Sequence, residues 1–153
     1  MNKSSKRLDN ELKSLSNESV CNAVVEVPDQ NNPYKWLVHL PGPQGSPFEG
    51  GVFKLSFEFP ANYPFKHPEV KFITPMYHPN IKRDTGEICM DVFASSWSPT
   101  QKVSDIIQKL ASLLSSPQTS SPLESEICKE YMNNPSSYNK NYNSLYIFCL
   151  ILI

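Results

Sequence analysis

Apolar residues recur at helical spacing in several parts of this chain. Over residues 4–15, leucines return every three or four positions among charged residues, a pattern that predicts an amphipathic helix with a basic first turn. Its charges suit either a solvated face or a docking surface for acidic partners. Over residues 100–115 the apolar stripe is wider, which predicts a core helix. Two shorter helices are expected after it, over residues 123–132 and from about Pro135, since proline suits the first turn of a helix.

Between the first two helices, the pattern changes to that of strands. Residues 20–27 are rich in β-branched side chains, and residues 34–40 and 51–59 alternate between apolar and polar positions. A fourth strand is expected over residues 69–73. Loops rich in proline, glycine and asparagine separate these segments, which favours a meander of consecutive strands. Three prolines exclude both a helix and a central strand from residues 60–68, so that segment is expected to be an ordered loop with aromatic side chains.

Length and charge limit the possible functions. At 153 residues the chain is expected to form one domain with a single core. Its 14 basic and 15 acidic residues give a net charge of −1, so neither nucleic acid nor an anionic membrane is expected to attract the protein as a whole. The four cysteines include no CxxC pair and follow a polar start without a signal-peptide pattern. They indicate a reducing, intracellular compartment, with neither a disulfide framework nor a structural metal site.

The last segment, residues 145–153, is apolar throughout and reads LYIFCLILI. Its nine residues fall short of the roughly 20 that a helix needs to cross a bilayer. We therefore expect a buried last turn or a surface for a partner, and a membrane-proximal anchor is a further alternative.

Cys89 differs from the other cysteines in its sequence surroundings. The polar run KRDTGE before it contains Gly86, a turn signal, which predicts that Cys89 lies at or near the surface. A cysteine thiolate can carry an acyl group as a thioester and pass it to an amine. The alternative is a buried cysteine with only a packing role.

The residues upstream of Cys89 bear on whether such a site would carry an acyl group or hydrolyse it. His78, the nearest histidine in sequence, precedes Pro79 in a rigid turn, which suits a structural cap better than a mobile base. The amide of Asn80 is suited either to stabilising an oxyanion at a thioester carbonyl or to bracing a loop. Without a strong base water is poorly activated, so the sequence favours an acyl carrier.

The stretch from Tyr77 to Pro99 resembles the active site of ubiquitin-conjugating enzymes, the E2 family, and the similarity extends from the first helix to about Tyr142. The motifs that carry it are, in order, PYKWLVHLPGPQGSPFEGGVF, FPANYPFKHPEVKF, YHPNI, GEICMD, WSP and SPL. The resemblance implies an α+β fold, the UBC fold: a four-stranded antiparallel meander sheet flanked by an N-terminal helix, a central helix and two C-terminal helices. It implies a ubiquitin-conjugating domain over residues 1–144, with the apolar tail at 145–153 outside it.

The resemblance also implies an enzyme with a cysteine thioester intermediate. Cys89 would accept ubiquitin from an activating enzyme (E1) and transfer it, usually with a RING or HECT ligase (E3), to a lysine of a substrate protein. Asn80 would be the second catalytic residue. The active-site loop would be supported by Tyr77, His78, Pro79, Ser120 and Ser121. The family's surface for E1 and E3 corresponds to Lys6, Arg7, Pro64, Phe65, Trp97, Ser98 and Pro99. No cofactor is implied, because the upstream E1 uses the ATP.

Two other functions are kept as alternatives: an E2 for another ubiquitin-like modifier, and an E2-like variant that only binds its partners. The presence of Cys89 and of the motif of residues 78–80 favours an active enzyme.

The expected location is the cytoplasm or the nucleus. The wording TGEIC, with one more residue between Asn80 and Cys89 than most relatives have, is similar to the peroxisome-associated branch.

Two features depart from the family pattern. Many relatives carry an acidic residue just before the proline of the SPL motif, where this chain has Thr119, Ser120 and Ser121. Phosphorylation of either serine would supply a negative charge of about −1.5 to −2 there. Gln108 is expected to face out of its helix, where many relatives place an apolar contact for the donor ubiquitin, so the folded-back state of the charged enzyme is expected to be less favoured.

Overall fold

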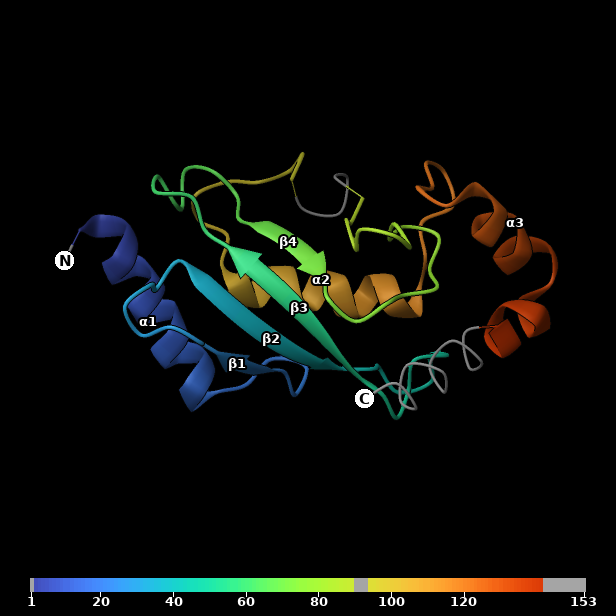
Figure 1. The fold of residues 1–153 in the computed structure, drawn as a ribbon, viewed down its shortest axis with the longest axis horizontal. Coiled ribbons are helices and arrows are strands. Elements are labelled where there is room, and N and C mark those ends of the chain that lie inside the picture. The colour runs from blue at the N-terminus through green and yellow to red at the C-terminus, as the bar shows by residue number, and fades with distance from the viewer. Residues whose placement is uncertain (1, 90–93, 142–153) are drawn as a thin grey trace.

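The four predicted strands form one antiparallel sheet in sequence order: β1 (Val24–Glu26), β2 (Lys35–Pro41), β3 (Val52–Glu58) and β4 (Glu69–Phe72). The structure is a computed structural model and describes residues 2–89 and 94–141. Helix α1 (Lys3–Asn17) lies beside β1, helix α2 (Val103–Ser115) crosses one face of the sheet, and helix α3 (Ser125–Asn133) lies at the opposite end of the molecule (Figure 1). Residues 135–141 are also helical. The predicted α+β meander with its flanking helices is confirmed.

The alternation of β2 and β3 determines which side chains enter the core. The inward residues, each at most 1% exposed, are Trp36, Val38 and Leu40 of β2 and Phe53, Leu55 and Phe57 of β3. The register pairs each of them with an inward residue of the other strand, and a slip of one strand by one residue would turn that strand's inward residues to solvent. On α2 the buried residues are the apolar stripe of the sequence: Val103, Ile106, Ile107, Leu110, Leu113 and Leu114.

The first strand is shorter than predicted, because its expected first half is a turn. Cys21 and Asn22 have φ angles of 54° and 57°, in the left-handed region. The N–H of Ala23 donates to the carbonyl of Val20 at 2.9 Å. This turn directs the chain from α1 into the sheet. The predicted helix over residues 100–115 also begins later than expected, at Val103.

The proline-rich segment of residues 60–68, called the proline loop below, is ordered as expected. Tyr63 is buried at 1% exposure, whereas Phe65 is 75% exposed. The loop therefore anchors itself in the core with one aromatic ring and presents another to solvent.

The predicted tail at residues 145–153 and the domain boundary at residue 144 lie outside the described residues. Within the part of the chain that the structure describes, no helix is long and apolar enough to cross a membrane.

Candidate active site

Cys89 follows a tight turn that lies against β4. Gly86 in this turn has a φ of +76°, and a Cβ placed there would lie 2.0 Å from the carbonyl oxygen of Phe72. Only glycine fits such a position. The N–H of Phe72 donates to the Gly86 carbonyl at 3.0 Å, and Ile81 pairs with Ile88 across the turn. These contacts fix the position of the turn and therefore the position of Cys89, three residues after Gly86.

The thiol of Cys89 faces a distant part of the chain, the loop of residues 116–124 between α2 and α3, called the α2–α3 loop. The Cys89 N–H donates to the Asn80 carbonyl at 2.9 Å, and Sγ lies 3.8 Å from the carbonyl oxygen of Ser121. Cys89 is only 6% exposed. The prediction that it lies at or near the surface is therefore wrong. The local sequence carried no information about the α2–α3 loop, whose Ser121 is 32 residues downstream.

His78 lies fully inside the protein, and both of its ring nitrogens have partners. Nε2 donates to the Leu113 carbonyl at 2.8 Å, and Nδ1 accepts the N–H of Asn80 at 3.0 Å. Burial lowers the pKa of the imidazole from 6.5 to about 4, and the hydrogen bond to Leu113 opposes this only in part. His78 is therefore neutral at physiological pH. It links Leu113 of α2 to the backbone of Asn80 and is not available as a base.

Asn80 and Pro79 bind the α2–α3 loop near each of its ends. The Asn80 Oδ1 accepts the N–H of Gln118, and Nδ2 donates to the carbonyl of Gln118, both at 2.8 Å. The Pro79 carbonyl accepts the N–H groups of Leu123 and Glu124 at 2.9 and 3.0 Å. Of the two roles that the sequence left open for Asn80, this geometry favours bracing the loop.

The other residues predicted to support the site lie on two sides of it. The Tyr77 hydroxyl donates to Glu130 of α3 at 3.2 Å, and its ring lies 5.8 Å from that of Tyr138. Tyr77 thus links the segment of residues 77–80 to the C-terminal helices. Ser120 and Ser121 are exposed on the α2–α3 loop.

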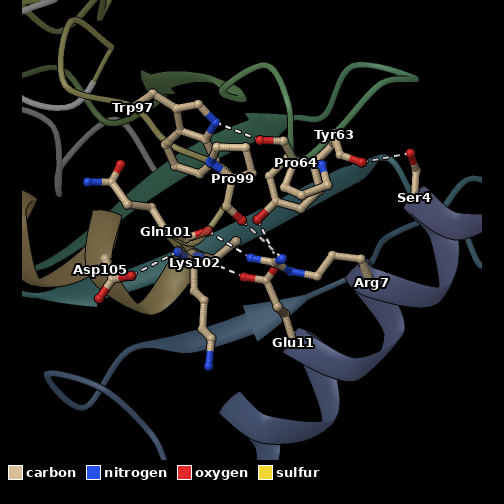
Figure 2. Close-up of polar contacts among 11 residues, drawn as sticks. Ser4, Arg7, Glu11, Tyr63, Pro64, Trp97, Pro99, Gln101, Lys102 and Asp105 are labelled. Atoms are coloured by element: carbon tan, nitrogen blue, oxygen red, sulfur yellow. Dashed lines mark hydrogen bonds and ion pairs between the residues drawn. The ribbon is translucent and has the colours of Figure 1, made fainter.

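The predicted partner-binding residues come from three segments that lie side by side (Figure 2). Trp97 Nε1 donates to the Pro64 carbonyl at 2.7 Å, which joins residues 97–103, called the WSP segment, to the proline loop. Phe65, Pro99 and Lys6 are exposed around this junction. The structure therefore brings the WSP motif and the proline loop together as expected.

Arg7 and Ser98, also predicted for this surface, are turned inward in part. The Arg7 guanidinium binds Glu11 at 2.9 Å, and its side chain is 27% exposed. Ser98 is half-buried, and its hydroxyl lies 2.8 Å from that of Thr100. Neither residue is fully displayed to solvent.

Sequence reasoning missed three residues that organise these sites: Glu11, Tyr63 and Gln118. Glu11 is 6% exposed and follows Leu8 by three positions, so its place on the apolar side of the first helix was readable. Tyr63 is a core aromatic whose hydroxyl partner lies on another element. Gln118 contributes only backbone atoms, so its side-chain type gave no signal.

The described cysteines, at positions 21, 89 and 128, are free thiols, and Cys21 is the exposed one among them. Within residues 2–89 and 94–141, no group of three or more His, Cys, Asp or Glu side chains could hold a metal ion.

Comparison with known sequences indicates the family of this chain. The model of the family described as ubiquitin-conjugating enzyme matches residues 7–146. Ubiquitin conjugating enzyme E2 B of Dictyostelium discoideum is 46% identical over 110 residues, which cover 72% of this chain and 74% of that protein.

Two solved structures are also similar to this chain. A Plasmodium yoelii protein assigned as a ubiquitin conjugating enzyme gives a TM-score of 0.88 at 36% identity, covering 95% of this chain and 94% of that one. The E2 domain of a Toxoplasma gondii ubiquitin conjugating enzyme gives a TM-score of 0.83 at 28% identity, with 92% and 94% covered. With a family match over most of its length and relatives that share its fold, this chain belongs to the ubiquitin-conjugating enzyme family.

Proposed function

We propose that this protein is an active ubiquitin-conjugating enzyme in which Cys89 carries ubiquitin. The Cys89 thiolate attacks the thioester carbonyl carbon on the activating enzyme; a new C–S bond forms and the activating enzyme's cysteine leaves as a thiolate. The amine of a substrate lysine then attacks the Cys89 thioester. The amide C–N bond forms, the Cys89 thiolate leaves, and the amine loses its proton to solvent.

The observation that supports this proposal best is that the histidine nearest to Cys89 in sequence, His78, cannot act as a base. The Sγ of Cys89 faces a backbone carbonyl at 3.8 Å. His78 is buried and neutral, with hydrogen bonds at both ring nitrogens. In a cysteine protease a histidine takes the thiol proton and later activates water. Since His78 can do neither, a thioester on Cys89 would persist, as a carrier requires.

The α2–α3 loop has a defined role in this proposal. Asn80 and Pro79 hold the loop beside the thiol through four hydrogen bonds to backbone atoms. The loop, held in one position, limits the orientations that the thioester can adopt, and this lowers the entropic cost of reaching the geometry for attack. Asn80 therefore acts by holding the loop in place.

The proposal assigns the surface around Phe65 to the activating enzyme and to a RING or HECT ligase. Phe65 is 75% exposed, and large aromatic side chains are common hot spots of protein interfaces. Lys6 is exposed on the neighbouring helix, where a positive charge would speed association with an acidic partner.

The test is the formation of an adduct that thiols destroy. The protein is incubated with activating enzyme, ATP and ubiquitin and run on gels without and with a reducing agent. We expect one band larger by one ubiquitin that disappears on reduction. Cys89→Ser is expected to lose this band or to convert it to a reductant-resistant ester. Cys128→Ser, which changes another buried cysteine, is the matched control and is expected to keep the band.

The absence of an adduct from a folded protein, beside a working control enzyme, would contradict the proposal for ubiquitin. The same gel with other ubiquitin-like proteins then separates the two alternatives. An adduct with one of them identifies a different modifier, and none with any of them indicates a role in binding only.

A further inference from the structure

Three segments of the predicted partner surface meet at one buried carboxylate, that of Glu11 (Figure 2). They are α1, the proline loop and the WSP segment. Glu11 is 6% exposed, and all its partners are hydrogen-bond donors. The WSP segment leads directly into α2, so the same carboxylate also touches the start of that helix.

The oxygens of Glu11 bind one group from each segment. Oε2 accepts the Tyr63 hydroxyl at 2.6 Å and Nε of Arg7 at 2.9 Å, and Oε1 accepts the N–H of Val103 at 2.7 Å. Burial and the hydrogen bond to Glu11 raise the pKa of Tyr63 far above its usual range, so its hydroxyl remains a donor. A negative charge is also favoured at the N-terminus of α2.

The guanidinium of Arg7 is used inside the protein. Besides Glu11, it donates from Nη1 to the Pro99 carbonyl at 3.2 Å and from Nη2 to the Gln101 carbonyl at 2.8 Å. It also lies 5.8 Å from the centroid of the Tyr63 ring. Each of its three nitrogens therefore has an internal partner.

The proline loop and the WSP segment are also joined to each other. Trp97 donates to the Pro64 carbonyl at 2.7 Å, and its ring lies 6.0 Å from that of Tyr63. On the other side of the loop, Ser4 of α1 lies 2.7 and 2.8 Å from the carbonyls of Ala61 and Tyr63. Each of the three segments is thus bonded to the other two.

We propose that Arg7 and Glu11 are positioning residues for partner binding. They hold the proline loop and the WSP segment against α1, so that Phe65, Trp97 and Pro99 form one preformed surface. Arg7 acts through backbone carbonyls and does not contact the partner. A preformed surface avoids the cost of ordering loops on binding. The identity of the partner rests on the proposed function, whereas the positioning itself concerns this chain alone.

Lys6 is a natural control for Arg7, because the two cations are adjacent in sequence and differ in placement. Lys6 is exposed, and Arg7 is turned inward. An exposed charge acts on a partner across solvent, and salt screens that attraction. A positioning effect is made within the protein and does not depend on salt in this way. The two residues should therefore respond differently to ionic strength.

The first measurement is amide hydrogen exchange in the full chain. We expect Arg7→Gln to raise exchange at Gln101 and Val103 by about tenfold or more, because the WSP segment opens locally, and Lys6→Gln to change it by less than about twofold. Glu11→Gln is expected to raise exchange at Val103. Arg7→Lys keeps the charge but lacks the planar fork of donors, so it should resemble Arg7→Gln and replaces it if that variant folds poorly. Unchanged exchange in the Arg7 and Glu11 variants would overturn the proposal.

The second measurement is the rate of ubiquitin transfer from the activating enzyme at low salt and at about 300 mM salt, where screening is strong. We expect Arg7→Gln to raise KM about tenfold in both conditions with kcat nearly unchanged, and Lys6→Gln to raise KM only at low salt. A salt-sensitive effect of Arg7→Gln like that of Lys6→Gln would indicate direct contact and overturn the proposal. If the wild type forms no adduct, the proposed function is wrong, and the exchange measurement still decides the positioning claim.

Discussion

The side-chain amide of Asn80 forms two hydrogen bonds with the backbone of a single residue, Gln118. Oδ1 accepts the N–H and Nδ2 donates to the carbonyl, each at 2.8 Å. This pairing fixes both the position and the direction of the α2–α3 loop. Three residues later the same loop presents the Ser121 carbonyl to the thiol of Cys89.

Asn80→Ala is therefore expected to loosen the loop and to affect the second half-reaction more than the first. We expect ubiquitin loading on Cys89 to stay within about twofold, discharge to free lysine to fall about tenfold or more, and alkylation of Cys89 to become faster. Single-turnover discharge and thiol labelling in a background with Cys21 and Cys149 changed to serine measure these effects. Gln118→Ala is the control, because it removes no backbone group and should behave as wild type. Slow labelling with unchanged loop dynamics in Asn80→Ala would argue for an oxyanion role instead.

The buried His78 should make the protein less stable in acid. Its folded pKa of about 4 lies below the ordinary 6.5, so between these values the unfolded chain binds a proton that the folded chain does not. Stability from this residue is complete above pH 6.5 and is lost as the pH falls toward 4. The loss should reach about 2 kcal/mol at pH 5 and about 3 kcal/mol at pH 4. Urea unfolding of wild type and His78→Gln at pH 7 and pH 5 tests this, and equal losses in the two proteins would contradict it.

Gly86 should tolerate alanine less well than Gly45, although both have positive φ. At Gly45 φ is +81° and an added Cβ would meet nothing within 4 Å, whereas at Gly86 it would lie 2.0 Å from the Phe72 carbonyl. We expect Gly45→Ala to cost about 1 kcal/mol through backbone strain alone, and Gly86→Ala to cost about 3 kcal/mol or more and to slow ubiquitin loading by displacing Cys89. Urea unfolding measures the difference. Similar losses at the two positions would show that the turn can move away from β4.

A negative charge on the α2–α3 loop should promote attack by lysine. Ser120 and Ser121 are exposed there, and the carbonyl oxygen of Ser121 lies 3.8 Å from the Sγ of Cys89. Ser121→Asp is expected to raise discharge to free lysine about threefold or more, because a carboxylate attracts the ammonium group and orients the amine. Ser136→Asp, an equal charge change on the exposed C-terminal helical segment, is the control and should have no effect. Unchanged discharge in both Ser120→Asp and Ser121→Asp would remove the case for a phosphorylation switch.

The sheet and the helices could be predicted from the sequence because each rests on a local pattern. The alternation of residues 51–59 appears in the structure as the alternating burial of β3, and the apolar stripe of residues 100–115 is the buried face of α2. The first strand was predicted too long because β-branched residues near Cys21 resemble a strand. Only the left-handed backbone at Cys21 and Asn22 reveals the turn.

The candidate site was less predictable, since its contacts join distant residues through backbone atoms. The prediction that Cys89 lies at or near the surface was wrong because the α2–α3 loop, which follows α2 in the sequence, lies against its thiol. The inward direction of Arg7 follows from acceptors at Pro99 and Gln101, and a carbonyl is present whatever the side chain. Glu11 could have been found from the sequence. Its position on the apolar face of α1 indicates burial, and a buried carboxylate needs hydrogen-bond donors as partners.

The backbone acceptors of Arg7 have a consequence for the substitutions that this surface can tolerate. Because the carbonyls at positions 99 and 101 persist through almost any substitution, the side chains around them can change without removing the support beneath. Substitutions at the exposed Phe65 and Thr100 can therefore change the outer surface, while the arginine on α1 preserves the arrangement beneath it. Variants at these exposed positions would therefore differ in their outer surface but share the framework that Arg7 and Glu11 hold in place.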